Sequence, residues 1–135
     1  MRDSLDLFDT LINWKKKNYI KETKQMKESL LFENVAIILF LNKEDLFDQK
    51  IRTSSLKVCF EDFNEDEKND VDSMAKSAKE FIARKFVEVN KTNVNSSKRD
   101  IYWHYTYALD RKNVETVVAS VKDKILKYML ESMRL

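Results

Sequence analysis

The sequence predicts a mixed α/β fold that forms part of a doubly wound sheet. Two short segments rich in branched and aromatic residues alternate with three segments of helical periodicity, in the order helix, strand, helix, strand, helix. The first strand segment, 35–41, is apolar throughout, which is typical of a parallel strand covered on both faces. Because two recognisable strands with flanking helices make a poor sheet alone, we expect the chain to contribute to a larger sheet.

The amino-terminal half is expected to hold a helix, a polar stretch and a strand. Leucine and phenylalanine residues recur at helical spacing across residues 3–14. Residues 15–27 carry six lysines in thirteen positions, which indicates a mobile excursion or an extra helical turn. The apolar strand at 35–41 follows, and the pattern predicts a short helix or loop at 46–56.

The second half begins with an acidic loop at 61–69 and continues with a helix at 71–87, for which Asp70 is the expected N-cap. A polar loop at 91–99 leads into an aromatic strand at 101–107. Asp110 is expected to cap a long final helix. The apolar stripe of that helix comprises Val114, Val117, Val118, Val121, Ile125, Leu126, Met129 and Leu130. No repeat or linker is evident, so residues 1–135 form one predicted domain.

The absence of glycine and proline excludes several kinds of site. A phosphate-cradling loop and a dinucleotide-binding turn both require glycine, and the chain has none. The net charge of +2 points to no particular partner, and nucleic acid is not expected. The single cysteine, Cys59, cannot form an internal disulfide, which suits a reducing compartment. No signal peptide, myristoylation start or membrane-spanning run is evident, so no membrane anchor is expected in these residues.

Each predicted strand ends in residues suited to recognise a nucleotide base. The first runs into Asn42, Lys43, Glu44 and Asp45, and the second into the segment 106–108. Ligands of open α/β sheets bind at the carboxyl ends of the strands. The Asp45 carboxylate can accept the two adjacent N–H donors of guanine, which adenine lacks, so such a group would discriminate strongly between the bases.

The neighbouring residues suit the same ligand. Asn42 can bond the base edge or tie the two loops together, and the stem of Lys43 can lie across the base. The amide of Ala108 can donate to the guanine oxygen, and its small side chain admits the base. A plain turn with a helix cap accounts equally well for residues 42–45 taken alone.

The motifs resemble a known family. Residues 38–51 (ILFLNKEDLFDQKI) resemble the base-recognition segment of heterotrimeric G-protein alpha subunits. Residues 4–13 and 101–126 resemble the helix before that segment and the family's last strand, following loop and final helix, in the right order. The resemblance implies a partial P-loop NTPase-type, Ras-like domain, with residues 1–135 as its carboxyl-terminal part. The family's phosphate loop, switch regions and helical domain have no counterpart in this sequence.

The resemblance also implies a guanine-nucleotide-binding transducer of G-protein-coupled receptor pathways. GTP or GDP would meet Asn42, Lys43, Asp45, Thr106 and Ala108 at its guanine end only. The expected partners are a receptor through the final helix, an effector and the beta-gamma subunits, at the cytoplasmic inner face of the plasma membrane. Mg²⁺ is expected in the family, but its ligands and the catalytic residues have no match here. Whether this chain is an enzyme therefore stays open. The alternative is a non-enzymatic, truncated interaction module that binds receptor or effector through its final helix.

The sequence departs from the family pattern in the loop after its last strand and in one longer segment. Tyr107 and Leu109 replace a cysteine and a threonine, so Tyr107 is expected to crowd the base pocket. The segment between Trp14 and Phe32 is longer than in the family. Its lysines indicate a solvated loop, with a basic patch facing a membrane or a partner as the alternative.

Overall fold

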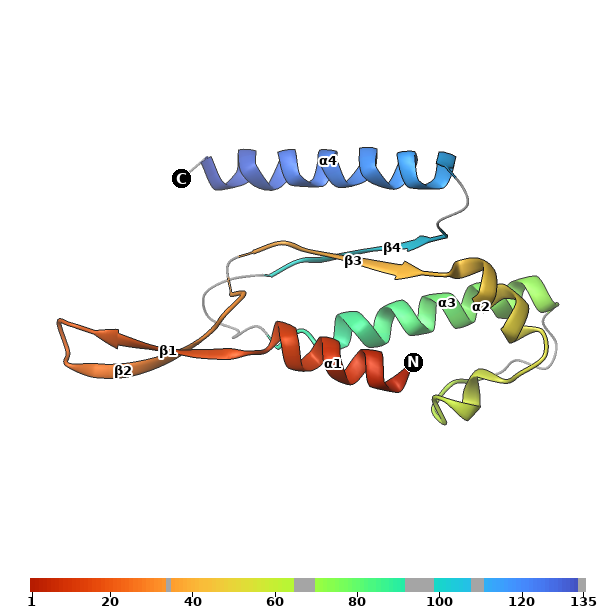
Figure 1. Cartoon of the computed structure of the whole chain (residues 1–135), viewed down its shortest axis with the longest axis horizontal. Helices are drawn as coiled ribbons and strands as arrows, with labels where there is room; N and C mark the ends of the chain where they lie inside the picture. Colours follow the sequence, from red (N-terminus) through yellow and green to blue (C-terminus); the bar gives the residue numbers. More distant parts are fainter. Residues whose placement is uncertain (34, 65–69, 92–98, 108–110, 134–135) are drawn as a thin grey trace.

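The computed structural model describes residues 1–33, 35–64, 70–91, 99–107 and 111–133 (Figure 1). Its elements, in chain order, are α1 (Arg2–Ile12), β1 (Lys15–Ile20), β2 (Gln25–Leu30), β3 (Ile37–Asn42), α2 (Glu44–Ile51), the short 3-10 helix η1 (Leu56–Val58), α3 (Val71–Glu88), β4 (Ile101–Thr106) and α4 (Arg111–Met133). The α/β class is confirmed, since β3 and β4 lie between α4 on one side and α1, α2 and α3 on the other.

Strands β3 and β4 form a parallel pair, as the apolar pattern predicted. The register runs from Ile37 opposite Ile101 to Asn42 opposite Thr106. Alternate residues of each strand face opposite layers. On one face the Tyr105 hydroxyl donates to the backbone oxygen of Lys79 in α3 at 2.8 Å. On the other, Lys124 of α4 lies 5.0 Å from the centre of the Tyr102 ring.

The expectation that residues 35–41 are covered on both faces was wrong. No described residue of β3 is buried, and the Phe40 side chain is 50% exposed. Within the described part of the chain, β3 pairs with β4 alone, and the apolar residues of α4 cover the outer face only in part. Of the described stripe residues of α4, Val117 is buried, whereas Ile125, Leu126 and Met129 are exposed.

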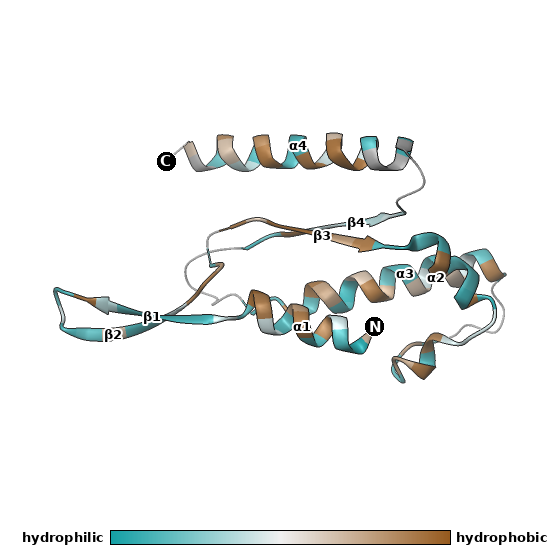
Figure 2. Cartoon of the chain, in the orientation of Figure 1, coloured by the Kyte–Doolittle hydropathy of each residue, from teal (hydrophilic) through white to brown (hydrophobic). Residues whose placement is uncertain are grey.

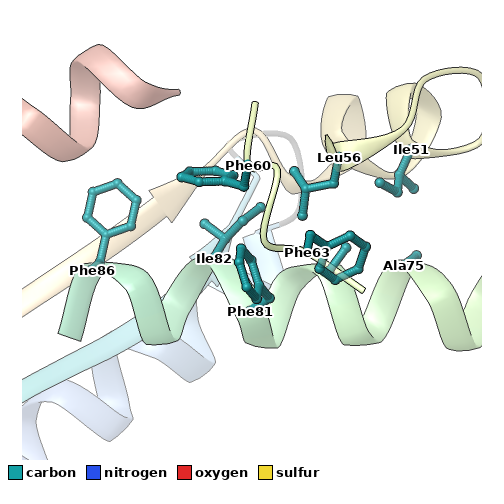
Figure 3. Packing of buried hydrophobic residues seen from close by; sticks show 9 residues of the cluster. Ile51, Leu56, Phe60, Phe63, Ala75, Phe81, Ile82 and Phe86 are labelled. Carbon is teal, nitrogen blue, oxygen red and sulfur yellow. The ribbon is translucent and has the colours of Figure 1, made fainter. Parts of the chain in front are cut away.

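The hydrophobic core lies between α3 and the segment that leads to it. Figure 3 shows phenylalanine side chains from both gathered around Ile82. The Phe81 ring meets the rings of Phe60 and Phe63 edge-on, with centroids 5.7 and 5.1 Å apart. Helix α1 adds Phe8, whose ring lies 5.5 Å from that of Phe86. This core holds α1 and α3 against the inner face of the β3–β4 sheet.

Helix α3 begins where the sequence places it. The Asp70 carboxylate accepts a hydrogen bond from the Ser73 amide at 2.7 Å, and this bond lowers the pKa of Asp70 below its ordinary value. The predicted N-cap is therefore confirmed. The predicted cap of the final helix, Asp110, lies outside the described residues. No helix in the described ranges is long and apolar enough to cross a bilayer.

Residues 15–30 form an antiparallel hairpin, so the expectation of a mobile excursion or helical turn at 15–27 was wrong. Six residues of β1 pair with six of β2. In a helix, Lys17, Lys21 and Lys24 would stand three or four positions apart, where like charges repel. In the hairpin, Lys17 instead faces Glu28. The pattern misled because neither strand alternates apolar and polar residues.

Arg99 joins four segments at the end of the sheet where β4 begins. Its side chain is only 3% exposed. The guanidinium donates to the backbone oxygens of Ile12 and Phe32, and to the side-chain oxygens of Asn13 (3.1 Å) and Asn90 (2.7 Å). Burial lowers the pKa of Arg99 from its ordinary value. The end of α1, the exit of the hairpin and the end of α3 are thus tied to one buried cation.

Replacing Arg99 should destabilise the whole chain. Arg99→Ala leaves buried acceptors without donors, so we expect a loss of about 2–4 kcal/mol in the free energy of unfolding. Urea denaturation monitored by circular dichroism measures it. Arg52→Ala is the matched control, because Arg52 pairs with Asp72 on an exposed surface and should cost less than about 1 kcal/mol. Equal losses in the two variants would contradict the role given to Arg99.

Candidate functional site

The parallel register brings the two predicted base-recognition segments to one edge of the sheet. Asn42 and Thr106 are the last paired residues of β3 and β4. The Thr106 hydroxyl donates to the side-chain oxygen of Asn42 at 3.3 Å. Asn42 is exposed and Thr106 half-buried. Of the two roles considered for Asn42, this bond fits the one that ties the loops together.

A single residue connects β3 to α2. Lys43 adopts the left-handed conformation, with φ 64° and ψ 42°. A residue with a Cβ in this region costs roughly 1 kcal/mol or more, and glycine, which would avoid the cost, does not occur in this chain. The turn starts α2 at Glu44, earlier than the predicted 46–56 segment. The motif therefore lies partly in a sharp strand-to-helix turn and partly in the first helical turn.

Asp45 occupies the first turn of α2 and is half-buried. Unlike Glu44 and Asp48 in the same helix, it has no ion-pair partner among the described residues. Unpaired backbone amides at a helix start favour a nearby negative charge. A carboxylate without an ion-pair partner at the carboxyl edge of the sheet is well suited to accept N–H donors from a ligand.

Lys79 of α3 forms ion pairs that hold α2 against α3 next to the motif at 42–45. Its ammonium nitrogen lies 2.6 Å from Glu44 Oε1, and 2.8 and 3.0 Å from the two carboxylate oxygens of Asp48. Burial opposes the charge of Lys79, but the carboxylates of Asp48 and Glu44 outweigh it and raise the pKa of Lys79. The Tyr105 hydroxyl bonds the Lys79 backbone, and burial raises the pKa of Tyr105. Helix α2 and strand β4 are thus connected to the same residue of α3.

An apolar groove of about 500 Å³ runs between α1 and β3, and the motif lies at its rim. Asn42 and Glu44 border the groove, whereas Asp45 does not. Most of the lining is aliphatic or aromatic, including Leu7 and Phe40. Because Asp45 lies outside this largely apolar lining, the groove meets the polar site at Asn42 but does not contain it.

The structure brings together Asn42, Lys43, Asp45 and Thr106, and Ala108 lies outside the described residues. Tyr107 is half-buried directly after β4. Sequence reasoning missed the support from Lys79, because nothing in a helical pattern singles out one lysine among many. The described residues contain no cluster of histidine, cysteine or acidic side chains that could hold a metal ion.

Comparisons with known proteins agree with the motifs. The sequence model of a family described as "G-protein alpha subunit" matches residues 1–125. The chain is 36% identical over 132 residues to the guanine nucleotide-binding protein alpha-3 subunit of Dictyostelium discoideum. That alignment covers 97% of this chain and 20% of the relative, so the chain spans about a fifth of the relative's length.

Removing the Lys79 ammonium should loosen α2. Lys79→Met leaves two half-buried carboxylates facing each other, and we expect a loss of about 1–3 kcal/mol in stability and faster amide exchange at 45–47. Because the folded-state pKa of Lys79 is raised above 10.5, this stabilisation is complete below that pH and disappears as the pH rises through the folded-state pKa. The difference from wild type in urea midpoint should therefore shrink in strong alkali.

The matched control is Lys76→Met, because Lys76 is exposed on the same helix and pairs with no acid in the described residues. Unchanged exchange at 45–47 in Lys79→Met, or an equal effect in the control, would contradict the proposed fastening of α2.

Proposed function

The chain belongs to the G-protein alpha subunit family, and from that premise we propose that it supplies the guanine-recognising part of a GTP- and GDP-binding signal transducer. Residues 1–135 would form the carboxyl-terminal part of a Ras-like domain. The whole protein would couple G-protein-coupled receptors to effectors, since that is what membership of the family implies.

The observation that carries the proposal is the arrangement of the two segments at one sheet edge. Asn42 and Thr106 are register partners, and the left-handed turn at Lys43 leads directly to Asp45. In the proposed complex, Asp45 accepts the N1 hydrogen and the 2-amino group of guanine. Asn42 holds the two loops together, and the stem of Lys43 covers the base. Ala108 donates its backbone amide to the guanine oxygen.

The environment of the Asp45 carboxylate supports its proposed role in binding a guanine base. Asp45 lacks an ion-pair partner among the described residues, whereas its neighbours Glu44 and Asp48 are both paired with Lys79. The acid that the ligand requires is therefore the one that the fold leaves unpaired. The half-buried Tyr107, directly after β4, is expected to reduce affinity more than base preference.

The remaining ligands and partners are proposed for the whole protein. Mg²⁺ would accompany the phosphates, and no residue of this chain is assigned to it. The receptor would contact the final helix, α4, and beta-gamma subunits and an effector would bind elsewhere. The protein would act at the cytoplasmic face of the plasma membrane.

A second candidate is a non-enzymatic interaction module. It is favoured by the apolar side chains that α4 exposes along its carboxyl-terminal half, among them Leu126, Met129 and Met133 at 58%, 51% and 75%. Such a stripe suits a groove in a receptor or effector. This candidate requires no nucleotide, so base-recognition experiments distinguish it from the first.

Asp45 should set the choice of base. The test joins the chain to the phosphate-binding half of a related subunit and measures competitive binding of GDP, XDP and ADP. Asp45→Asn puts a donor opposite a guanine hydrogen, so we expect GDP binding to weaken by about 2–4 kcal/mol. Xanthine carries an oxygen where guanine carries its amino group, so XDP binding should improve. Lys43→Ala should weaken GDP and XDP more evenly.

The control for charge is Asp72→Asn, which removes an exposed carboxylate on α3 and should leave all three affinities unchanged. If Asp45→Asn left the order of preference unaltered, residues 42–45 would be an ordinary turn and the proposed function would fail.

The 135 residues alone should not hydrolyse GTP. Hydrolysis depends on positioning the phosphates and offsetting their charge with a metal ion, lysine and arginine, and the glycine loop that holds phosphates is absent from this sequence. Phosphate release from GTP by the purified chain should match that of buffer. Magnesium-dependent release that Asp45→Asn abolishes would show that the chain completes a catalytic site by itself.

A further inference from the structure

The hairpin β1–β2 carries a concentration of positive charge on a projecting element. Figure 1 shows it extending beyond the helices and the β3–β4 sheet, and Figure 2 shows it to be mostly hydrophilic. Residues 15–30 contain six lysines and two glutamates. One of these glutamates, Glu28, is paired with Lys15 at 3.7 Å. No other lysine of the hairpin has an ion pair within the described ranges, and six lysines against two glutamates give residues 15–30 a net charge of +4.

Two large apolar side chains break this charged surface near the tip. Tyr19 and Met26 are cross-strand partners and therefore lie on the same face. They are 59% and 61% exposed, so they pack against no other part of the described structure to any great extent. Lys21 and Lys24 occupy the turn just beyond them, and Lys24 adopts a positive φ of 54°. If the hairpin contacted only water, two exposed apolar side chains among its lysines would have no function.

The base of the hairpin is held firmly by the body of the protein. The Leu31 amide donates to the Trp14 backbone oxygen at 2.7 Å, and Leu30 is buried. The buried Arg99 donates to the Phe32 backbone oxygen just beyond. The base of the hairpin is therefore anchored to the body of the protein.

We propose that the hairpin binds an anionic lipid surface, with Tyr19 and Met26 entering the headgroup region and the lysines contacting lipid phosphates and carboxylates. Lysines near such a surface gain from its negative potential, and tyrosine suits a boundary between water and hydrocarbon. An acidic protein would match the lysines but would not require both exposed apolar side chains at the tip. The carboxyl-terminal end of α4 points toward the same end of the molecule as the hairpin (Figure 1).

The experiment is co-sedimentation of the 135-residue chain with vesicles of phosphatidylcholine alone or with added phosphatidylserine. Binding should require phosphatidylserine and weaken as salt rises. The triple variant Lys17→Gln, Lys21→Gln and Lys24→Gln should lose about fivefold in partition coefficient for each lysine, or on the order of 100-fold together. The matched control, Lys57→Gln, Lys76→Gln and Lys122→Gln, removes the same charge from exposed positions elsewhere and should lose far less.

A second readout tests insertion of the tip. The fluorescence of a Tyr19→Trp variant, after subtraction of the wild-type signal from Trp14 and Trp103, should shift to the blue with phosphatidylserine vesicles. Met26→Ser should weaken binding without a change in charge. The proposal is overturned if the wild type does not bind anionic vesicles, if the control loses as much as the hairpin variant, or if residue 19 stays in water. It does not depend on guanine binding.

Discussion

The register between β3 and β4 is the constraint on which the candidate site depends. Six consecutive residue pairs fix how far each strand runs, so Asn42 and Thr106 end at the same level. A shift of one residue would turn the side chains of one strand to the opposite face and separate the two loops. The bond between Thr106 and Asn42 spans the two chain segments at the point where both leave the sheet. The proposed base recognition would therefore depend on strand pairing more than on any single loop.

Two charged side chains hold the ends of this arrangement by different means. At the site end, Lys79 meets carboxylates from α2, and the opposite charges outweigh the effect of partial burial on its charge. At the other end, Arg99 meets only neutral oxygens, and its planar group serves several of them at once. A lysine could not replace Arg99, because one ammonium cannot reach acceptors on three separate segments. The ion pairs of Lys79 position the motif at 42–45, whereas the hydrogen bonds of Arg99 join α1, the hairpin and α3.

Much of the fold could be predicted from periodicity, because α3 and its Asp70 cap, the aromatic strand at 101–106 and the long final helix all leave strong local patterns. The family and the segments of the site followed from the order of short motifs. The hairpin could not be predicted, since its stability comes from cross-strand pairs such as Tyr19 with Met26 and not from alternation within one strand. The roles of Arg99 and Lys79 were also hidden, because each depends on partners far away in the sequence. Residue type alone does not say which faces are covered, as the exposed tryptophans Trp14 and Trp103 show.

The closed base of the hairpin has a consequence for how this region can change in length. The chain leaves the body of the protein at Trp14 and returns at Leu31, and a backbone hydrogen bond joins these two residues. Adding or removing one residue in β1 together with one in β2 would lengthen or shorten the hairpin and leave β3 in its place. Evolution could therefore vary this segment among homologues without disturbing the far edge of the sheet. The same geometry makes the tip a natural place to graft an epitope or a fluorescent reporter.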